Sequence, residues 1–149
     1  LLWLGSSWLP LALREAPALS TTNSASAPSD SGQTPWQTWT AADVQSQLNA
    51  GRPVFVDFTA AWCVTCQYNK KTTLADPQVL ADFAARQVLL MRADWTRRDP
   101  AITQALTALG RSGVPVYALY APGQSPVLLS ELLSVAEVQA ALQRLPMKK

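Results

Sequence analysis

The stretch from Val54 to Cys66, V-F-V-D-F-T-A-A-W-C-V-T-C, constrains the fold of this chain more than any other. Residues 54–58 are β-branched or aromatic except for one aspartate, a composition typical of a buried strand. The residues from Cys66 onward continue as a helical pattern, and the chain has no cysteines besides Cys63 and Cys66. A strand followed by C-x-x-C and a helix predicts a redox-active cysteine pair.

The two thiols are expected to play different parts. Cysteines three residues apart on one helical turn lie on the same face, close enough to form a disulfide. Backbone N–H groups at a helix start stabilise a thiolate. Cys63 is therefore expected to be partly exposed, to have a depressed pKa and to be the attacking thiol. Cys66, one turn further along, is expected to be buried and to resolve the mixed disulfide.

Three other roles for the cysteine pair are less well supported. A structural disulfide is disfavoured, because a loop this short removes little entropy from the unfolded chain. A structural zinc site needs four ligands, whereas the chain offers two cysteines and no histidine, so no metal is expected. Two inert core cysteines are the remaining alternative.

Asp57 stands inside the apolar run, six residues before Cys63. A buried carboxylate here would have a raised pKa and could relay a proton to or from Cys66. The alternative is an ordinary strand-end aspartate that reaches solvent. If the predicted strand 87–95 lies beside this one, the Arg92 guanidinium approaches Asp57 and opposes the rise in its pKa. Strand alternation leaves open the alternative that Arg92 points to solvent.

Helical and strand patterns alternate through the rest of the domain. Thr40 and Ser134 are expected N-caps, with Glu137 completing a capping box, and Gly51 is expected to end the first helix. The order of elements predicts an α/β sandwich around a mixed central sheet. The expected strands are 36–39, 53–58, 87–95, 114–120 and 127–130, and the expected helices are 40–49, 64–74, 76–86, 99–110 and 134–145.

The N-terminal part of the chain differs from this domain. Residues 1–13, L-L-W-L-G-S-S-W-L-P-L-A-L, are apolar, yet a bilayer-spanning helix needs about 20 residues. We interpret them as the end of a transmembrane helix, in a fragment that begins inside or just after it; a hydrophobic tail folded onto the domain is the alternative. Residues 14–35 are rich in small polar residues and proline, which predicts a flexible linker before a domain at 36–149.

The charge of the chain argues against one class of partner. Its net charge is +2, and 15% of its residues are charged, without a basic cluster. Nucleic-acid-binding domains carry clustered lysine and arginine, so nucleic acid is not an expected partner.

The motifs resemble a known family. W-C-V-T-C, with Asp57 before it and Gly113-Val114-Pro115 about fifty residues later, is similar to the thioredoxin superfamily. V-D-F-T-A-A-W-C-V-T-C and T-T-L-A-D-P-Q-V-L resemble the C-terminal domain of the DsbD family, over about residues 36–145. The resemblance implies a thioredoxin-like fold and a cis Pro115 packed against the cysteines. It also implies that the Val114 backbone pairs with an incoming peptide, and that Trp62 both packs and lines the surface around Cys63.

The resemblance implies a function as well. A domain of this kind faces the periplasm at a bacterial inner membrane, takes two electrons from a membrane-embedded dithiol of the same protein and passes them to a partner disulfide. It needs no cofactor, because the dithiol carries the electrons. A membrane-tethered reductase for cytochrome c maturation and a redox-inactive peptide-binding module that uses Pro115 are the alternatives. The chain departs from its relatives at Val64-Thr65, where thioredoxin has glycine-proline, and at Lys70, where DsbD relatives can carry glutamate.

Overall fold

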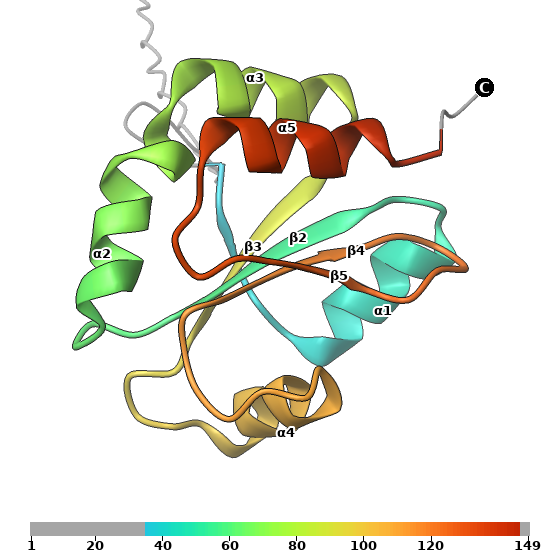
Figure 1. Ribbon diagram of the computed structural model, residues 1–149. Helices are drawn as coiled ribbons and strands as arrows, with labels where there is room; N and C mark the ends of the chain where they lie inside the picture. Colours follow the sequence, from blue (N-terminus) through green and yellow to red (C-terminus); the bar gives the residue numbers. More distant parts are fainter. Residues whose placement is uncertain (1–34, 147–149) are drawn as a thin grey trace, which may run out of the picture. The chain divides into compact units, whose positions relative to one another are not determined.

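The computed structural model describes residues 35–146, which form one mixed sheet flanked by helices (Figure 1). The strand order is β1-β3-β2-β4-β5; β3 is parallel to β1 and β2, whereas β4 is antiparallel to β2 and β5. This is the predicted α/β, thioredoxin-like sandwich. Its elements are β1 (Gln37–Thr38), α1 (Ala41–Asn49), β2 (Val54–Thr59), α2 (Val64–Lys71), the 3₁₀ helix η1 (Thr73–Ala75), α3 (Pro77–Ala85), β3 (Leu89–Asp94), α4 (Pro100–Ala108), β4 (Val116–Tyr120), β5 (Val127–Leu129) and α5 (Val135–Gln143).

Helices cover both faces of the sheet, so the central strand β2 is buried along its whole length. Phe55 packs in a core cluster with Phe83 of α3 and with residues of α5. Val56 belongs to a second cluster, which includes residues of α1 and α4. Figure 1 shows α3 and α5 over one face and α1 and α4 over the other. Asp57 is in phase with Phe55, so its side chain lies on the same face of β2 as that of Phe55.

Side-chain caps define where the helices begin. Thr40 Oγ1 accepts a hydrogen bond from the Asp43 N–H at 3.0 Å, and Asp76 and Asp99 cap helices whose first residue is proline. Gly51 adopts a φ of +85° just after α1, a left-handed conformation that glycine reaches without strain. The predicted starts of these helices and the predicted role of Gly51 are therefore confirmed.

Only one of the two hydrogen bonds of the capping box predicted for α5 is present. Ser134 Oγ accepts from the Glu137 N–H at 3.1 Å, as predicted. The Glu137 carboxylate, expected to return to the Ser134 N–H, instead accepts from the Ser130 N–H at 2.7 Å and from the Ser130 hydroxyl at 2.6 Å. Two donors on one residue satisfy both carboxylate oxygens at once, so the side chain joins α5 to the end of β5.

The helix predicted over 64–74 is wrong at its C-terminal end. It stops at Lys71, and Thr72 leaves helical geometry with φ −111° and ψ −96° before η1 begins. The Thr72 hydroxyl donates to the Tyr68 carbonyl at 2.8 Å, and the Thr73 hydroxyl donates to the Leu133 carbonyl at 3.0 Å. Threonine hydroxyls compete with the backbone for hydrogen bonds, which explains the break between α2 and η1.

Two predicted segments lie wholly or mostly outside the described residues, namely the transmembrane end at 1–13 and the linker at 14–35. Within residues 35–146, none of the helices combines the length and the apolar character that crossing a bilayer requires. The interpretation of the N-terminal segments therefore stays a prediction.

Candidate active site at the cysteine pair

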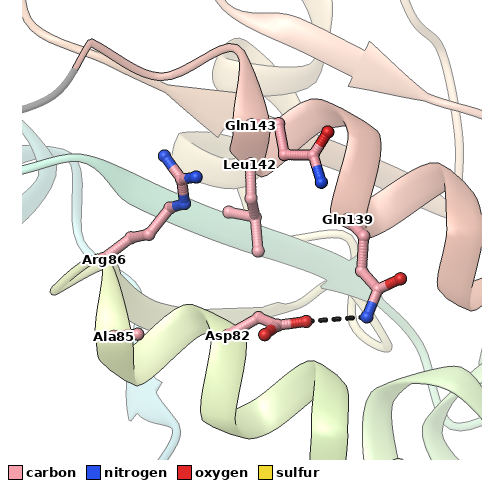
Figure 2. Close-up of a pocket in the computed structure, with 6 residues that line it drawn as sticks. All are labelled: Asp82, Ala85, Arg86, Gln139, Leu142 and Gln143. Atoms are coloured by element: carbon pink, nitrogen blue, oxygen red, sulfur yellow. Dashed lines mark hydrogen bonds between the residues drawn. The ribbon is translucent and has the colours of Figure 1, made fainter.

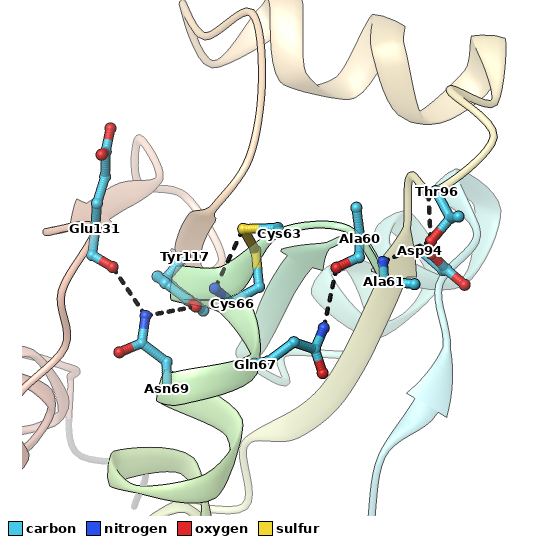
Figure 3. The surroundings of a disulfide bond; sticks show 10 residues. All are labelled: Ala60, Ala61, Cys63, Cys66, Gln67, Asn69, Asp94, Thr96, Tyr117 and Glu131. Carbon is cyan, nitrogen blue, oxygen red and sulfur yellow. Dashed lines mark hydrogen bonds between the residues drawn. A yellow bond between two sulfur atoms is a disulfide. The ribbon is translucent and has the colours of Figure 1, made fainter.

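Cys63 and Cys66 form a disulfide at the start of α2, with their Cα atoms 5.2 Å apart (Figure 3). Cys63 is the N-cap of the helix, and its sulfur accepts a hydrogen bond from the Cys66 N–H at 3.2 Å. When the pair is reduced, the same position offers a helix N-terminus to the Cys63 thiolate. Such an arrangement stabilises the negative charge and favours Cys63 as the nucleophile.

The exposure of Cys63 differs from the prediction. Only 7% of Cys63 is exposed, so it is buried rather than partly exposed, while Cys66 is fully buried as predicted. Ala60 and Val114 pack against the disulfide, which explains why Cys63 is less exposed than its place at a helix start predicted. The order of accessibility is still the predicted one, because Cys63 alone of the two reaches the surface.

Asp57 is fully buried, which excludes the solvent-reaching alternative. Its register partners are Arg92 on β3 and Tyr117 on β4. Arg92 Nε donates to Asp57 Oδ2 at 2.9 Å, so the predicted approach of the guanidinium is confirmed. The guanidinium also lies over the Trp36 ring, 4.2 Å from its centre. Asp57 Oδ1 has no hydrogen-bond partner among the described residues.

Burial raises the pKa of Asp57 above its ordinary value, and the Arg92 hydrogen bond and the charges of Arg92 and Lys70 only partly oppose this rise. Lys70 lies one turn after Cys66 on α2, and its own pKa is lowered by burial. Burial of Asp57 prevails over the opposing charge of Lys70. Asp57 therefore keeps its proton to a higher pH than an exposed aspartate does.

A loop beyond β3 holds the turn that precedes Cys63. The Thr96 hydroxyl accepts from the Ala61 N–H at 2.8 Å, and the Thr96 carbonyl accepts from Trp62 Nε1 at 3.1 Å. Trp62 packs against Trp95 with ring centres 6.1 Å apart, yet 48% of Trp62 remains exposed. Its predicted double character, packed and exposed, is confirmed. Thr96 is a positioning residue that the sequence patterns do not indicate.

The loop before β4 supplies the second side of the site. The Val114–Pro115 peptide bond is cis, as the resemblance implied, and Pro115 is buried while Val114 packs against the cysteines. Among the described residues, no hydrogen bond engages the backbone N–H or carbonyl of Val114. Both backbone groups of Val114 are therefore unpaired among the described residues, and the role of Val114 in binding a peptide stays a prediction.

Asn69 and Tyr117 form a polar pair that the sequence reasoning missed. Both are fully buried, and Asn69 Nδ2 donates to the Tyr117 hydroxyl at 2.8 Å (Figure 3). Two signals could have found them. Asn69 lies three residues after Cys66, on the same helical face, and Tyr117 carries one of the two hydroxyl groups in the apolar strand β4.

A hollow between α3 and α5 contains no thiol (Figure 2). Asp82, which lines the hollow from α3, accepts from Gln139 Nε2 at 2.8 Å and from Gln78 Nε2 at 2.9 Å. Both carboxylate oxygens are thus occupied within the protein, and we assign no part of the redox chemistry to this hollow. It is lined by Asp82, Ala85, Arg86, Gln139, Leu142 and Gln143.

Curated proteins with similar sequences are thiol:disulfide interchange proteins. The chain is 33% identical over 119 residues to DsbD 1 of Pseudomonas aeruginosa, covering 76% of this chain and 19% of that protein. It is 36% identical over 74 residues to DsbD of Escherichia coli K12, covering 50% of this chain and 13% of that protein. The chain thus spans about a fifth or less of the length of these relatives.

Solved structures share the fold. The reduced C-terminal domain of Neisseria meningitidis DsbD has a TM-score of 0.59 at 20% identity, covering 70% of this chain and 96% of that domain. A thioredoxin from Thermus thermophilus has a TM-score of 0.58 at 21% identity, covering 73% of this chain and 84% of its own. Residues 35–122 also match a family model described as thioredoxin-like. With its cysteine pair at the start of α2, the chain belongs to the thioredoxin-like family and resembles the C-terminal domain of DsbD.

Proposed function

We propose that this chain is a protein-disulfide reductase domain that faces the periplasm at a bacterial inner membrane. It relays electrons from a membrane-embedded dithiol of the same protein to a partner disulfide in the periplasm. The observation that carries the proposal is the Cys63–Cys66 disulfide, whose Cys63 sulfur accepts an N–H at the start of α2. The similarity to thiol:disulfide interchange proteins supports this assignment over a redox-inactive peptide-binding module.

The exchange follows from the arrangement of the two thiols. The Cys63 thiolate attacks one sulfur of the partner disulfide, forms a mixed disulfide and releases the other partner sulfur as a thiolate. Cys66 then gives its proton to the Asp57 carboxylate and attacks Cys63 Sγ. The Cys63–Cys66 disulfide closes, and the second partner sulfur leaves as a thiolate. Two electrons pass to the partner, and the reverse sequence with the membrane-embedded dithiol restores the reduced pair.

The buried position of Asp57 supports its part in the second step. A thiol is a poor nucleophile until it loses its proton, and Cys66 is fully buried, away from water that could accept that proton. Asp57 Oδ2 is held by Arg92, whereas Oδ1 has no partner among the described residues and can accept the proton. A carboxyl group with a raised pKa exchanges protons with a thiol more readily near neutral pH than an ordinary aspartate does.

The predicted linker would serve both partners of the domain. A flexible tether of small polar residues keeps the domain near the membrane-embedded dithiol and gives it the reach to meet a periplasmic disulfide. Tethering raises the effective concentration of each partner, which favours fast exchange through short-lived encounters.

Single-cysteine variants test this proposal. The Cys66→Ser variant keeps the nucleophile and lacks the resolving thiol, so it should accumulate mixed disulfides in the periplasm of a bacterium that expresses it. Non-reducing electrophoresis and mass spectrometry would identify the partners as proteins with an exchangeable disulfide. Cys63→Ser is the matched control and should trap none.

Reduction of insulin by the dithiol form separates the enzyme from a binding module. The wild-type chain with dithiothreitol should precipitate insulin faster than dithiothreitol alone, and Cys63→Ser should not. The proposed function would be contradicted if the wild-type chain failed to accelerate insulin reduction and the Cys66→Ser variant also trapped no partner. Trapping of apocytochrome c alone would favour the cytochrome c maturation alternative.

A further inference from the structure

The orientation of the Asn69 side-chain amide is determined by two backbone groups. Nδ2 donates to the Glu131 carbonyl at 2.8 Å, and Oδ1 accepts from the Leu133 N–H at 3.3 Å. A carbonyl can only accept and an N–H can only donate, so exchanging the amide oxygen and nitrogen would break both bonds. Asn69 must therefore present a donor, the second hydrogen of Nδ2, to the Tyr117 hydroxyl at 2.8 Å.

This donor determines what the Tyr117 hydroxyl can do. Its oxygen accepts from Asn69, so its single hydrogen must point toward a different acceptor. Tyr117 is fully buried, and no described group accepts that hydrogen at hydrogen-bond distance. A buried hydroxyl donor without an acceptor is costly, which implies that a further acceptor completes the network.

An unused buried acceptor lies on the neighbouring strand. Asp57 and Tyr117 are register partners on antiparallel strands, so their side chains stand on the same face of the sheet. Within residues 35–146, neither Asp57 Oδ1 nor Thr59 Oγ1 has a hydrogen-bond partner; Thr59 lies two residues along the same strand, on the same face. The charge of Asp57 also acts on Tyr117, whose pKa is raised by burial and by that carboxylate.

We propose that Tyr117 is a positioning residue for the proton transfer between Asp57 and Cys66. Asn69 directs the Tyr117 hydroxyl hydrogen away from itself, and one bridging water connects that hydroxyl to Asp57 Oδ1. The Tyr117 hydroxyl and Asp57 Oδ1 are not directly hydrogen-bonded in the structure, and a water between them would satisfy both groups. A buried water typically satisfies about three polar atoms, and Thr59 Oγ1, on the same face of β2 as Asp57, is a further buried atom without a partner among the described residues. The inference rests on the proposed exchange function, in which Asp57 accepts the Cys66 proton.

The bridge has a defined effect on Asp57. A donor directed at Oδ1 stabilises the ionised carboxylate, so it acts in the same direction as Arg92 on β3 and Lys70 on α2, and against burial. Removing the hydroxyl should therefore raise the pH at which Asp57 ionises. In the oxidised protein neither cysteine titrates, so the Asp57 titration can be followed without interference from Cys66.

The experiment compares two tyrosines of β4 in the oxidised full chain. Tyr117→Phe removes the hydroxyl and keeps the ring, which stacks on Phe55. Carbon-13 NMR of the aspartate carboxyl groups should show the Asp57 midpoint about one pH unit higher than in wild type, a roughly tenfold change in proton affinity. Tyr120→Phe is the matched control, because burial alone raises the Tyr120 pKa, and it should leave the midpoint unchanged.

The reciprocal measurement follows Tyr117 instead of Asp57 and uses the wild-type chain, so it does not depend on a variant that folds. With tyrosine labelled at Cζ, the Tyr117 signal of the wild-type chain should move in a step at the Asp57 midpoint, and the Tyr120 signal should not. A Tyr117 signal that stays flat through the Asp57 titration, or an equal shift of the midpoint in both phenylalanine variants, would overturn the inference. Neither readout involves disulfide exchange, so this test is independent of the insulin and trapping assays.

Discussion

Replacing Asp57 by asparagine should separate the contribution of this residue to stability from its contribution to exchange. The substitution conserves shape and leaves an amide oxygen that can accept from Arg92 Nε in place of Oδ2. Arg92 is 26% exposed and rests on the Trp36 ring, so its charge can be solvated once the carboxylate is gone. We therefore expect Asp57→Asn to fold.

The stability effect has a sign that follows from the raised pKa of Asp57. At a pH below the unfolded-state pKa, both states are protonated, and the stability associated with this group is fully present. As pH rises through the folded-state pKa, the unfolded state gains more from ionisation, and that stability is lost. The loss is about 1.4 kcal/mol for each pH unit between the two midpoints. Asp57→Asn abolishes it, so the variant gains stability relative to wild type between pH 4 and pH 8.

Urea unfolding of oxidised wild type and Asp57→Asn at pH 4 and pH 8 measures this difference in stability. The other titrating groups contribute equally to both proteins, so their contributions cancel in the comparison. Asp82→Asn, at the half-buried carboxylate between α3 and α5, is the control. If the stability of wild type fell no more than that of Asp57→Asn between pH 4 and pH 8, the inference that burial raises the Asp57 pKa would be refuted.

The kinetic effect of Asp57→Asn should appear in the step in which Cys66 attacks the mixed disulfide. General-base catalysis contributes about 100- to 10,000-fold, and the Arg92 ion pair weakens the base, so we expect a loss of about 100-fold. The loss should be largest below neutral pH, where hydroxide cannot replace the base. Stopped-flow reduction of a partner disulfide as a function of pH tests this. An identical pH profile in wild type and variant would remove Asp57 from the mechanism.

Three further predictions concern the surroundings of the disulfide. In the reduced protein, brief iodoacetamide treatment followed by peptide mass mapping should find Cys63 alkylated and Cys66 largely unmodified, because Cys66 is fully buried; equal labelling would contradict the assigned roles. Arg92→Met should raise the pH at which Asp57 ionises, because it removes the hydrogen bond and the positive charge that lower the Asp57 pKa. Carboxyl NMR measures this midpoint, and Arg52→Met is the control. An unchanged midpoint in Arg92→Met would show that the ion pair has no effect on the Asp57 pKa. Thr96→Val should cost about 1 kcal/mol in urea unfolding, because the Ala61 N–H loses its acceptor, whereas Thr107→Val on the exposed face of α4 should cost less.

Local physical chemistry determined much of this protein from its sequence. The run of β-branched and aromatic residues predicted β2, and Thr40 and Ser134 predicted where two helices begin, because a cap acts on N–H groups within three residues of itself. The cysteine spacing likewise predicted a disulfide on one helical turn. These features depend on neighbours in the chain, which a sequence displays directly.

Contacts between distant segments were decided only by the tertiary structure. Burial of Cys63 depends on Val114, and the turn before it depends on Thr96. The Glu137 carboxylate left its expected capping partner because β5 places Ser130 within reach. The polar pair of Asn69 and Tyr117 joins residues 48 positions apart. The reason is the same in each case: hydrogen bonding and burial depend on distance in space, and sheet pairing brings together residues that no local pattern connects.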